Sequence, residues 1–85
     1  MEIFYTPHFK REAKALPVRL RGQIEKRIML FQNDPFDPVL KTHKLSGGLS
    51  EFWSFSIDHR IRIIFEFERE TRVIFHSIGN HSIYD

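Results

Sequence analysis

The chain has 85 residues, a net charge of +2 with neutral histidines, and no cysteine. This length suits one compact domain and is too short for two, so we expect a single domain over residues 1–85. The lack of cysteine excludes disulfides, thiolate nucleophiles and thiolate metal sites. An aromatic content of 14% is enough to build a core and argues against disorder. Because no apolar run reaches membrane-spanning length and no signal-peptide pattern opens the chain, we expect a cytoplasmic protein.

The first half of the chain predicts one strand and two helices. Met1 to Thr6 alternates weakly and is typical of a strand. Thr6-Pro7 favours a helix start, with threonine as the N-cap and proline at the first helical position, and this helix runs to about Ala15. Pro17 interrupts it, and a second helix is expected from about Val18 to Gln32. The apolar stripe of this second helix is Leu20, Ile24, Ile28 and Phe31.

The second half predicts three strands. Residues 39–50 are expected to form a connector with a turn at Gly47-Gly48. The strands are expected at Glu51 to Ile57, Arg60 to Phe67 and Arg72 to Ile78, with a turn near Asp58-His59 and a polar loop over 68–71. The order β-α-α-β-β-β indicates an α+β fold, in which two N-terminal helices pack on one face of a mainly antiparallel sheet.

Strand alternation places two arginines together. In the strand from Arg60 to Phe67, Arg60, Arg62 and Ile64 should share one face, and the intervening residues should share the other. Two arginines on one sheet face are costly if they are buried and unpaired. Either an ion pair with Glu66 or Glu68 satisfies Arg62, or the face is an open surface that binds anions, for which arginine is well suited.

Two histidines could lie near this face. His43 precedes the predicted sheet meander and His81 follows its last strand, so His43, Arg60, Arg62 and His81 could cluster, with Tyr84 nearby. Two imidazoles around an arginine suit RNA cleavage by the 2′-hydroxyl, which needs a base, an acid and a cation at the phosphate. His8 and His59 are interpreted as surface residues and His76 as a half-buried strand residue. A zinc site of His76 and His81 is a weaker alternative, so we expect no metal and no cofactor.

The stretch from Leu45 to Phe65 resembles the YoeB/Txe branch of the RelE/ParE toxin superfamily. The tail from Ile78 to Tyr84 resembles the ending of that family, in which a histidine and an aromatic residue follow the last strand. His43 lies in an H-x-L-x-G segment similar to that of YafQ-type toxins. The residues that match the branch are Leu49-Ser50-Glu51-Phe52-Trp53-Ser54, then Ile57, then Arg62-Ile63-Ile64-Phe65, with the spacing from Trp53 to Arg62 kept.

The resemblance implies a RelE-like fold and the toxin of a type II toxin–antitoxin pair, a ribosome-dependent endoribonuclease that cuts mRNA in the ribosomal A site. On this resemblance Arg62 matches the catalytic arginine, His81 the C-terminal histidine that is a candidate general acid, and Tyr84 the terminal aromatic residue. His43 stands where YoeB proteins carry a glutamate base and is the candidate base here. Two residues, Ser82 and Ile83, separate His81 from Tyr84, whereas YoeB proteins have none there.

The implied partners are a cognate antitoxin, mRNA and 16S/23S ribosomal RNA, while the oligomeric state stays open. Basic residues are the candidates for phosphate contacts, although a solvated helix face is the plainer interpretation of those in the first helices. A ParE-like toxin that binds gyrase without cutting RNA is the main alternative, and a non-toxic antitoxin-binding remnant is another. The RNA-binding candidates are Lys10, Arg11, Lys14, Arg19, Arg21, Lys41, Lys44 and Arg60.

Overall fold

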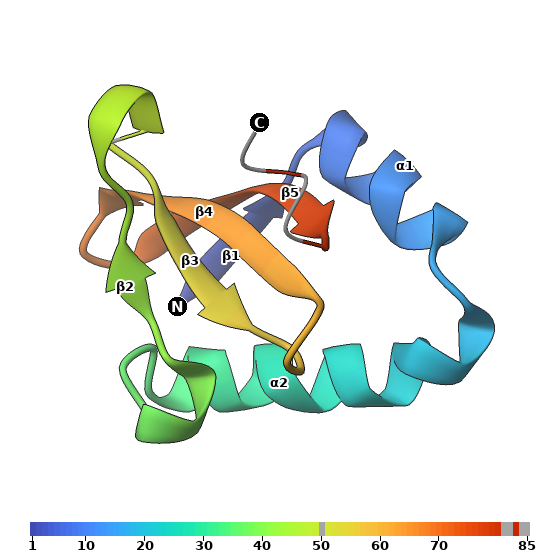
Figure 1. Cartoon of the computed structure of the whole chain (residues 1–85). Coiled ribbons are helices and arrows are strands. Elements are labelled where there is room, and N and C mark those ends of the chain that lie inside the picture. The colour runs from blue at the N-terminus through green and yellow to red at the C-terminus, as the bar shows by residue number, and fades with distance from the viewer. Residues whose placement is uncertain (50, 81–82, 84–85) are drawn as a thin grey trace.

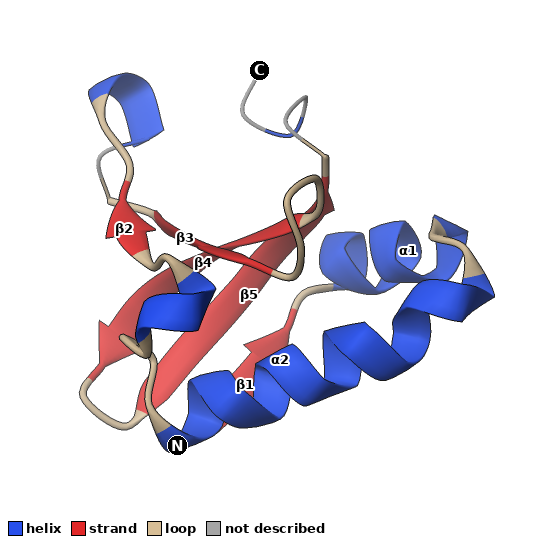
Figure 2. Cartoon of the chain, turned by 60° about the horizontal axis from the view of Figure 1, so that its bottom comes forward, coloured by secondary structure: helices blue, strands red, loops and turns tan. Residues whose placement is uncertain are grey.

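The computed structural model describes residues 1–49, 51–80 and 83 of the chain. Five strands form one sheet in the order β1-β5-β4-β3-β2, and two α-helices pack on the same side of it (Figures 1 and 2). Only β1 and β5 are parallel, and the other neighbours are antiparallel. The predicted α+β class with a mainly antiparallel sheet is therefore confirmed. The elements are β1 (Glu2–Tyr5), α1 (Pro7–Ala15), α2 (Arg21–Asn33), β2 (His43–Lys44), β3 (Trp53–Ser56), β4 (Arg62–Arg69) and β5 (Arg72–Gly79), with short 3₁₀ turns η1 (Val18–Leu20), η2 (Pro38–Leu40) and η3 (Gly47–Leu49).

The start of α1 follows the predicted cap. The Thr6 hydroxyl accepts a hydrogen bond from Phe9 N at 3.0 Å, and Pro7 occupies the first turn, where its missing N–H costs nothing. The helix ends at Ala15 because Leu16, which precedes Pro17, adopts the extended backbone that a following proline favours. The boundaries predicted for this helix are confirmed.

The second helix begins three residues later than predicted. Pro17 is followed by the 3₁₀ turn η1, and α2 starts at Arg21 without a side-chain cap. The predicted apolar stripe of α2 is nonetheless confirmed. Phe31 is fully buried, and Leu20, Ile24 and Ile28 are partly buried against the core. Neither helix of the described residues is long and apolar enough to cross a membrane.

The structure has one short edge strand that we did not predict. His43 and Lys44, which we expected in a connector, form β2 and pair antiparallel with Ser54 and Trp53. The sheet therefore has four strands after the helices instead of three. A two-residue strand shows no alternation of polar and apolar side chains, so the sequence pattern could not separate it from a loop.

The turn between β3 and β4 corrects the placement of Arg60. Asp58 Oδ1 accepts hydrogen bonds from Arg60 N at 2.8 Å and Ile61 N at 2.7 Å, so the aspartate side chain closes the turn. As a result β4 begins at Arg62, and Arg60 is exposed in the turn. The prediction that Arg60 is a strand residue on the face of Arg62 is wrong.

Removing the Asp58 side chain should weaken this turn. Burial by itself would raise the pKa of Asp58, but the two backbone N–H donors, together with the charges of His59 and Arg60, outweigh it and hold the pKa below its ordinary value. Ionised Asp58 thus stabilises the fold above its unfolded-state pKa, and this stabilisation is lost as pH falls through the lower folded-state pKa. We expect Asp58→Ala to cost about 1 kcal/mol near neutral pH.

Urea unfolding over a range of pH checks this expectation. The difference in unfolding free energy between wild type and Asp58→Ala should be largest near neutral pH and should shrink as pH falls below the ordinary pKa of aspartate, about 4. A difference that grows on acidification would contradict the assigned direction of the Asp58 pKa.

The core lies between the helices and one face of the sheet. Phe31 of α2 stacks on Phe55 of β3 at 4.6 Å between ring centroids and meets the edges of Phe65 and Phe75 at 4.9 and 5.5 Å. All four rings are fully buried. Since the core residues of β3 and β4 point to the helices, the alternate residues of these strands belong to the opposite face, which no helix covers.

Candidate active site

The register of the sheet places His43 and Arg62 on its helix-free face. His43 pairs with Ser54, which pairs with Ile64 of β4, while Arg62 pairs with Ser56, two residues along β3 from Ser54. Residues that pair directly across antiparallel strands project to the same face, as do residues two apart along a strand. His43 and Arg62 are separated by two strand spacings across the sheet, about 10 Å, and by two residues along it, about 7 Å. Two long side chains can bridge this separation around a phosphate.

Arg62 is half-buried and has no acidic partner among the described residues. Its Nη1 donates to Ser56 Oγ at 3.2 Å, while its Nε is buried and makes no hydrogen bond. The glutamates that could have paired with it are engaged elsewhere. Glu66 lies 2.9 Å from His76 Nε2 and Glu68 lies 3.0 Å from Arg72 Nε. The predicted structural alternative, an ion pair of Arg62 with Glu66 or Glu68, is therefore wrong, and this guanidinium keeps donors for an anion.

His43 is exposed on β2 and its ring is oriented by the backbone. Nδ1 lies 2.9 Å from the carbonyl oxygen of Lys41. Because a carbonyl can only accept, Nδ1 must carry the proton in this contact, which leaves the lone pair of Nε2 free in the neutral ring. This is the tautomer in which Nε2 can act as a general base.

The two lysines predicted near the site, Lys41 and Lys44, lie in different places. Lys41 and Arg62 line one cavity of about 570 Å³ at the end of β3. Lys44 follows His43 in β2 and is paired with Trp53, so it belongs to the helix-side face of the sheet. The structure thus brings Lys41 to Arg62 and separates Lys44 from both.

The basic residues of the helices form a second group. All five predicted candidates are exposed, and four of them border one surface hollow of about 450 Å³ between α1 and the start of α2. No carboxylate of the described residues lines this hollow, so its lining is positively charged. Arg19 lies outside its lining. The four residues of the hollow are Lys10, Arg11, Lys14 and Arg21.

His81 and Tyr84 lie outside the described residues, so their roles stay predictions. Next to them, Ile83 is described, and its backbone N–H donates to Asn80 O at 3.1 Å. A Cβ added to Gly79 would lie 2.6 Å from Ile83 Cγ2. Only glycine permits this close approach, and Gly79 is the cross-strand partner of Arg62. Ile83 therefore lies against the end of β5, where Gly79 pairs with Arg62.

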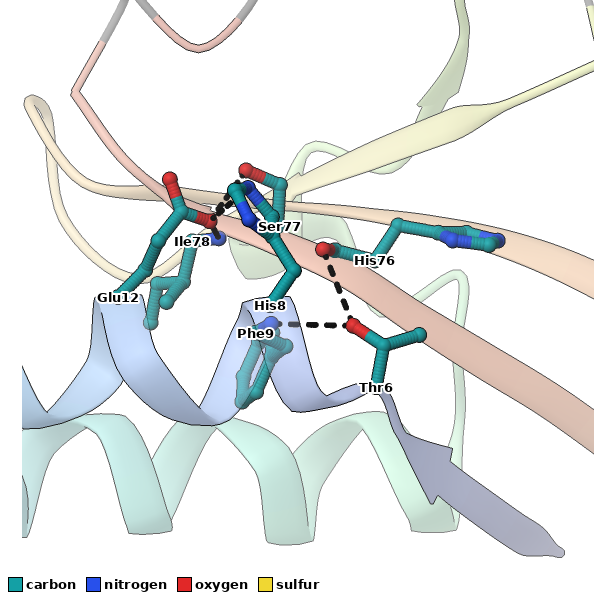
Figure 3. Close-up of polar contacts among 7 residues, drawn as sticks. All are labelled: Thr6, His8, Phe9, Glu12, His76, Ser77 and Ile78. Carbon is teal, nitrogen blue, oxygen red and sulfur yellow. Dashed lines mark hydrogen bonds and ion pairs between the residues drawn. The ribbon is translucent and has the colours of Figure 1, made fainter.

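Glu12 is a structural residue of this region that the sequence analysis did not predict. One oxygen of its carboxylate, Oε1, accepts from Ser77 Oγ at 2.6 Å and Ile78 N at 3.1 Å, and lies 3.2 Å from His8 Nε2 (Figure 3). The only signal in the sequence is the i, i+4 spacing of His8 and Glu12 on α1. Glu12 fastens α1 to the end of β5, just before Gly79.

Metal-ligating side chains do not gather in the described part of the chain, where no three or more His, Asp or Glu residues are placed to hold an ion. His76, which we considered as a zinc ligand, is half-buried and pairs with Glu66, in agreement with its interpretation as a satisfied strand residue. His8 and His59 are exposed on α1 and in the β3–β4 turn, as predicted.

No protein-family model matches the chain, and no curated protein matches it. Solved structures do match. YafQ from E. coli strain BL21(DE3) superposes with a TM-score of 0.81 at 17% identity, over 98% of this chain and 96% of that one. The YoeB/ParE toxin from Agrobacterium tumefaciens gives 0.78 at 19% identity, over 95% and 99% of the two chains. The chain therefore shares the fold of these YafQ and YoeB/ParE structures.

The likeness extends to toxins solved with their antitoxins. In the YoeB–YefM complex from Staphylococcus aureus, the matched chain gives a TM-score of 0.75 at 16% identity, over 95% of this chain and 97% of that one. The RelE-like fold predicted from the motifs around Trp53 and Arg62 is confirmed. The matches cover nearly the whole length on both sides, so the shared architecture includes both helices and the sheet that carries Arg62.

Proposed function

We propose that this chain is the toxin of a type II toxin–antitoxin pair and cleaves mRNA in the ribosomal A site. One observation carries the proposal: a half-buried arginine, Arg62, shares the helix-free face with His43. Among the described residues Arg62 has no carboxylate partner and Nε2 of His43 has no hydrogen bond. The likeness to YafQ and YoeB toxins supports it. A site of this composition can bind a phosphate and take up a proton beside it.

The proposed reaction is the attack of a 2′-hydroxyl on the adjacent phosphate. His43 Nε2 removes the hydroxyl proton, and the new bond from O2′ to phosphorus forms as the bond to the 5′-oxygen breaks. Arg62 donates to the phosphate oxygens, on which negative charge grows. His81 gives a proton to the leaving 5′-oxygen, and Tyr84 orients or stacks the RNA. The products are a 2′,3′-cyclic phosphate and a 5′-hydroxyl.

The proposed partners follow from the same proposal. The solved neighbours include DinJ–YafQ and YoeB–YefM complexes, so we propose a cognate antitoxin for this chain as well. Ribosomal RNA is the proposed partner of the hollow bordered by Lys10, Arg11, Lys14 and Arg21, because a positive surface without acids favours a polyanion.

Growth arrest and RNA mapping test the proposal against a ParE-like activity. Expression of the chain should stop growth, and primer extension on cellular mRNA should show new ends at codons in the A site. Mass spectrometry of the fragments should find cyclic phosphate ends. Growth arrest without any new mRNA ends would exclude the nuclease and favour gyrase binding instead.

His43→Gln should slow cleavage and alter its pH dependence. A glutamine side chain has no group that takes up a proton near neutral pH, so the limb of the pH–rate profile that reports the base should disappear. We expect a loss of about 10²–10⁴-fold at the pH optimum of the wild type. Single-turnover rates over a pH series measure this change. His8→Gln, a change of an exposed histidine on α1 that lines neither the cavity of Arg62 nor the basic hollow, is the control and should leave the profile unchanged. An unchanged profile in His43→Gln would remove His43 from the role of base.

A further inference from the structure

A cavity of about 570 Å³ lies between η2, the β3–β4 turn and α2, at the end of the sheet where β2 no longer covers β3. Arg62 and Ser56 line it from the sheet, Arg27 from α2, and Lys41 from the segment after η2. Its size falls within the range of pockets that take small ligands, about 300–1,000 Å³, and is more than one phosphate group needs.

The charges of this cavity are unbalanced. Three cationic side chains, Arg27, Lys41 and Arg62, line it with a single carboxylate, that of Asp58. Asp58 Oδ1 is already engaged by two backbone N–H groups of its turn. None of the three cations makes an ion pair with a described residue, and Arg27 uses only one donor, from Nη1 to Val39 O at 3.1 Å. Like charges held around one space repel each other, and an anion in that space removes the repulsion.

Lys41 joins this cavity to the candidate base. Its backbone has a left-handed φ of 53°, which lysine rarely adopts, and is held by the bond from Lys41 N to Pro38 O at 3.2 Å. In this conformation the carbonyl oxygen of Lys41 accepts a hydrogen bond from Nδ1 of His43. The side chain of Lys41 lines the cavity together with Arg62. A ligand in the cavity would therefore lie against the same arginine that faces the scissile phosphate.

We propose that the cavity of Arg27, Lys41 and Arg62 binds a second phosphate of the RNA chain, adjacent to the scissile one. This inference rests on the proposed function and adds a binding subsite to it. Arg27 and Lys41 hold the neighbouring phosphate, and Arg62 lies at the border of the two. These contacts are equally strong in the bound RNA and in the transition state. They therefore lower KM without changing the rate at saturating RNA.

Dinucleotides with a 2′-O-methyl group in place of the attacking hydroxyl test this subsite. One carries only the internal phosphate, and two others carry an additional terminal phosphate at the 5′ or the 3′ end. NMR titration of the full chain at low ionic strength gives their affinities. We expect one of the two phosphorylated forms to bind about five- to tenfold more tightly than the unphosphorylated form.

Variants identify the residues that cause this gain in affinity for the phosphorylated dinucleotide. Arg27→Gln should abolish it, and Lys41→Asn should reduce it, since asparagine tolerates the left-handed backbone while removing the charge. Arg27→Lys should keep most of the gain because a phosphate also accepts from an ammonium group. Arg69→Gln removes one positive charge at the far end of β4 and serves as the control that should not change it.

The outcomes separate this proposal from the proposed function. If neither terminal phosphate tightens binding, or if Arg27→Gln and Lys41→Asn keep the full gain, the subsite is overturned while the nuclease proposal stands. These cations would then serve acidic groups of a partner protein. If the gain depends on Arg27 and Lys41 but the chain cuts no mRNA, the phosphate subsite is supported and the nuclease proposal fails.

Discussion

Replacing Arg62 with alanine should slow RNA cleavage by about 10²–10³-fold while leaving the fold nearly as stable as before. The rate falls because the guanidinium is the only cation assigned to the developing charge on the scissile phosphate. The stability changes little because Arg62 has no carboxylate partner in the described part of the chain that would be left unpaired. Its buried Nε also lacks a hydrogen bond to these residues. We expect a change in unfolding free energy within about 1 kcal/mol.

Arg72→Ala is the matched control for this experiment. Arg72 is also a half-buried strand arginine, but it bridges Glu2 at 3.2 Å and Glu68 at 3.0 Å. Its removal should lower stability more than the removal of Arg62 and should leave the cleavage rate at saturating RNA unchanged. Arg62→Lys keeps the charge but loses the bidentate donors, so we expect it to restore only part of the rate. Single-turnover cleavage and urea unfolding, measured on the same preparations, check both variants. Full activity in Arg62→Ala would end the role that we give to this residue.

Local sequence signals predicted the elements wherever one strong feature decides the backbone. Thr6-Pro7 set the start of α1, and the apolar residues of α2 set its buried side, because a cap and a helical period act over a few neighbouring residues. Where a strand preference and a turn preference compete, the prediction was wrong. The Asp58 side chain took two backbone donors into a turn and moved Arg60 out of the strand.

The candidate site was predictable only in part, because its decisive contacts join distant segments. Alternation in β4 placed Arg62 on the face opposite Ile63, and the structure agrees. The choice of partners for Glu66 and Glu68 was not decided by spacing, since both glutamates were near enough in sequence to reach Arg62. Only the register of β4 on β5 pairs Glu66 with Ile74, beside His76. The cavity of Arg27, Lys41 and Arg62 likewise depends on how η2 packs, which no local pattern shows.

Glu12→Ala should destabilise the fold more than Asp58→Ala or Arg62→Ala, with a loss of about 2–3 kcal/mol in unfolding free energy. The reason is the outer edge of β5. β1 ends at Tyr5, opposite Phe75, so within the described ranges the last residues of β5 have no neighbouring strand on that side. Glu12 replaces the missing strand by accepting Ile78 N at 3.1 Å and Ser77 Oγ at 2.6 Å (Figure 3). Alanine leaves both donors unsatisfied in a partly buried place.

Glu12→Gln and Glu25→Ala separate this contact from the general effect of losing an acid. Glutamine keeps an oxygen that can accept from Ile78 N, so we expect it to lose less than half as much stability as alanine. Glu25 is exposed on α2 and should tolerate alanine within about 0.5 kcal/mol. Hydrogen exchange of the Ile78 amide gives a local measure, because in Glu12→Ala this amide loses its acceptor and should exchange faster than the amides of β4. If Ile78 stays as protected as in wild type, Glu12 does not hold the end of β5. If it is freed, the strand end that carries Gly79 toward Arg62 is freed with it, and cleavage should fall even though Glu12 never touches the RNA.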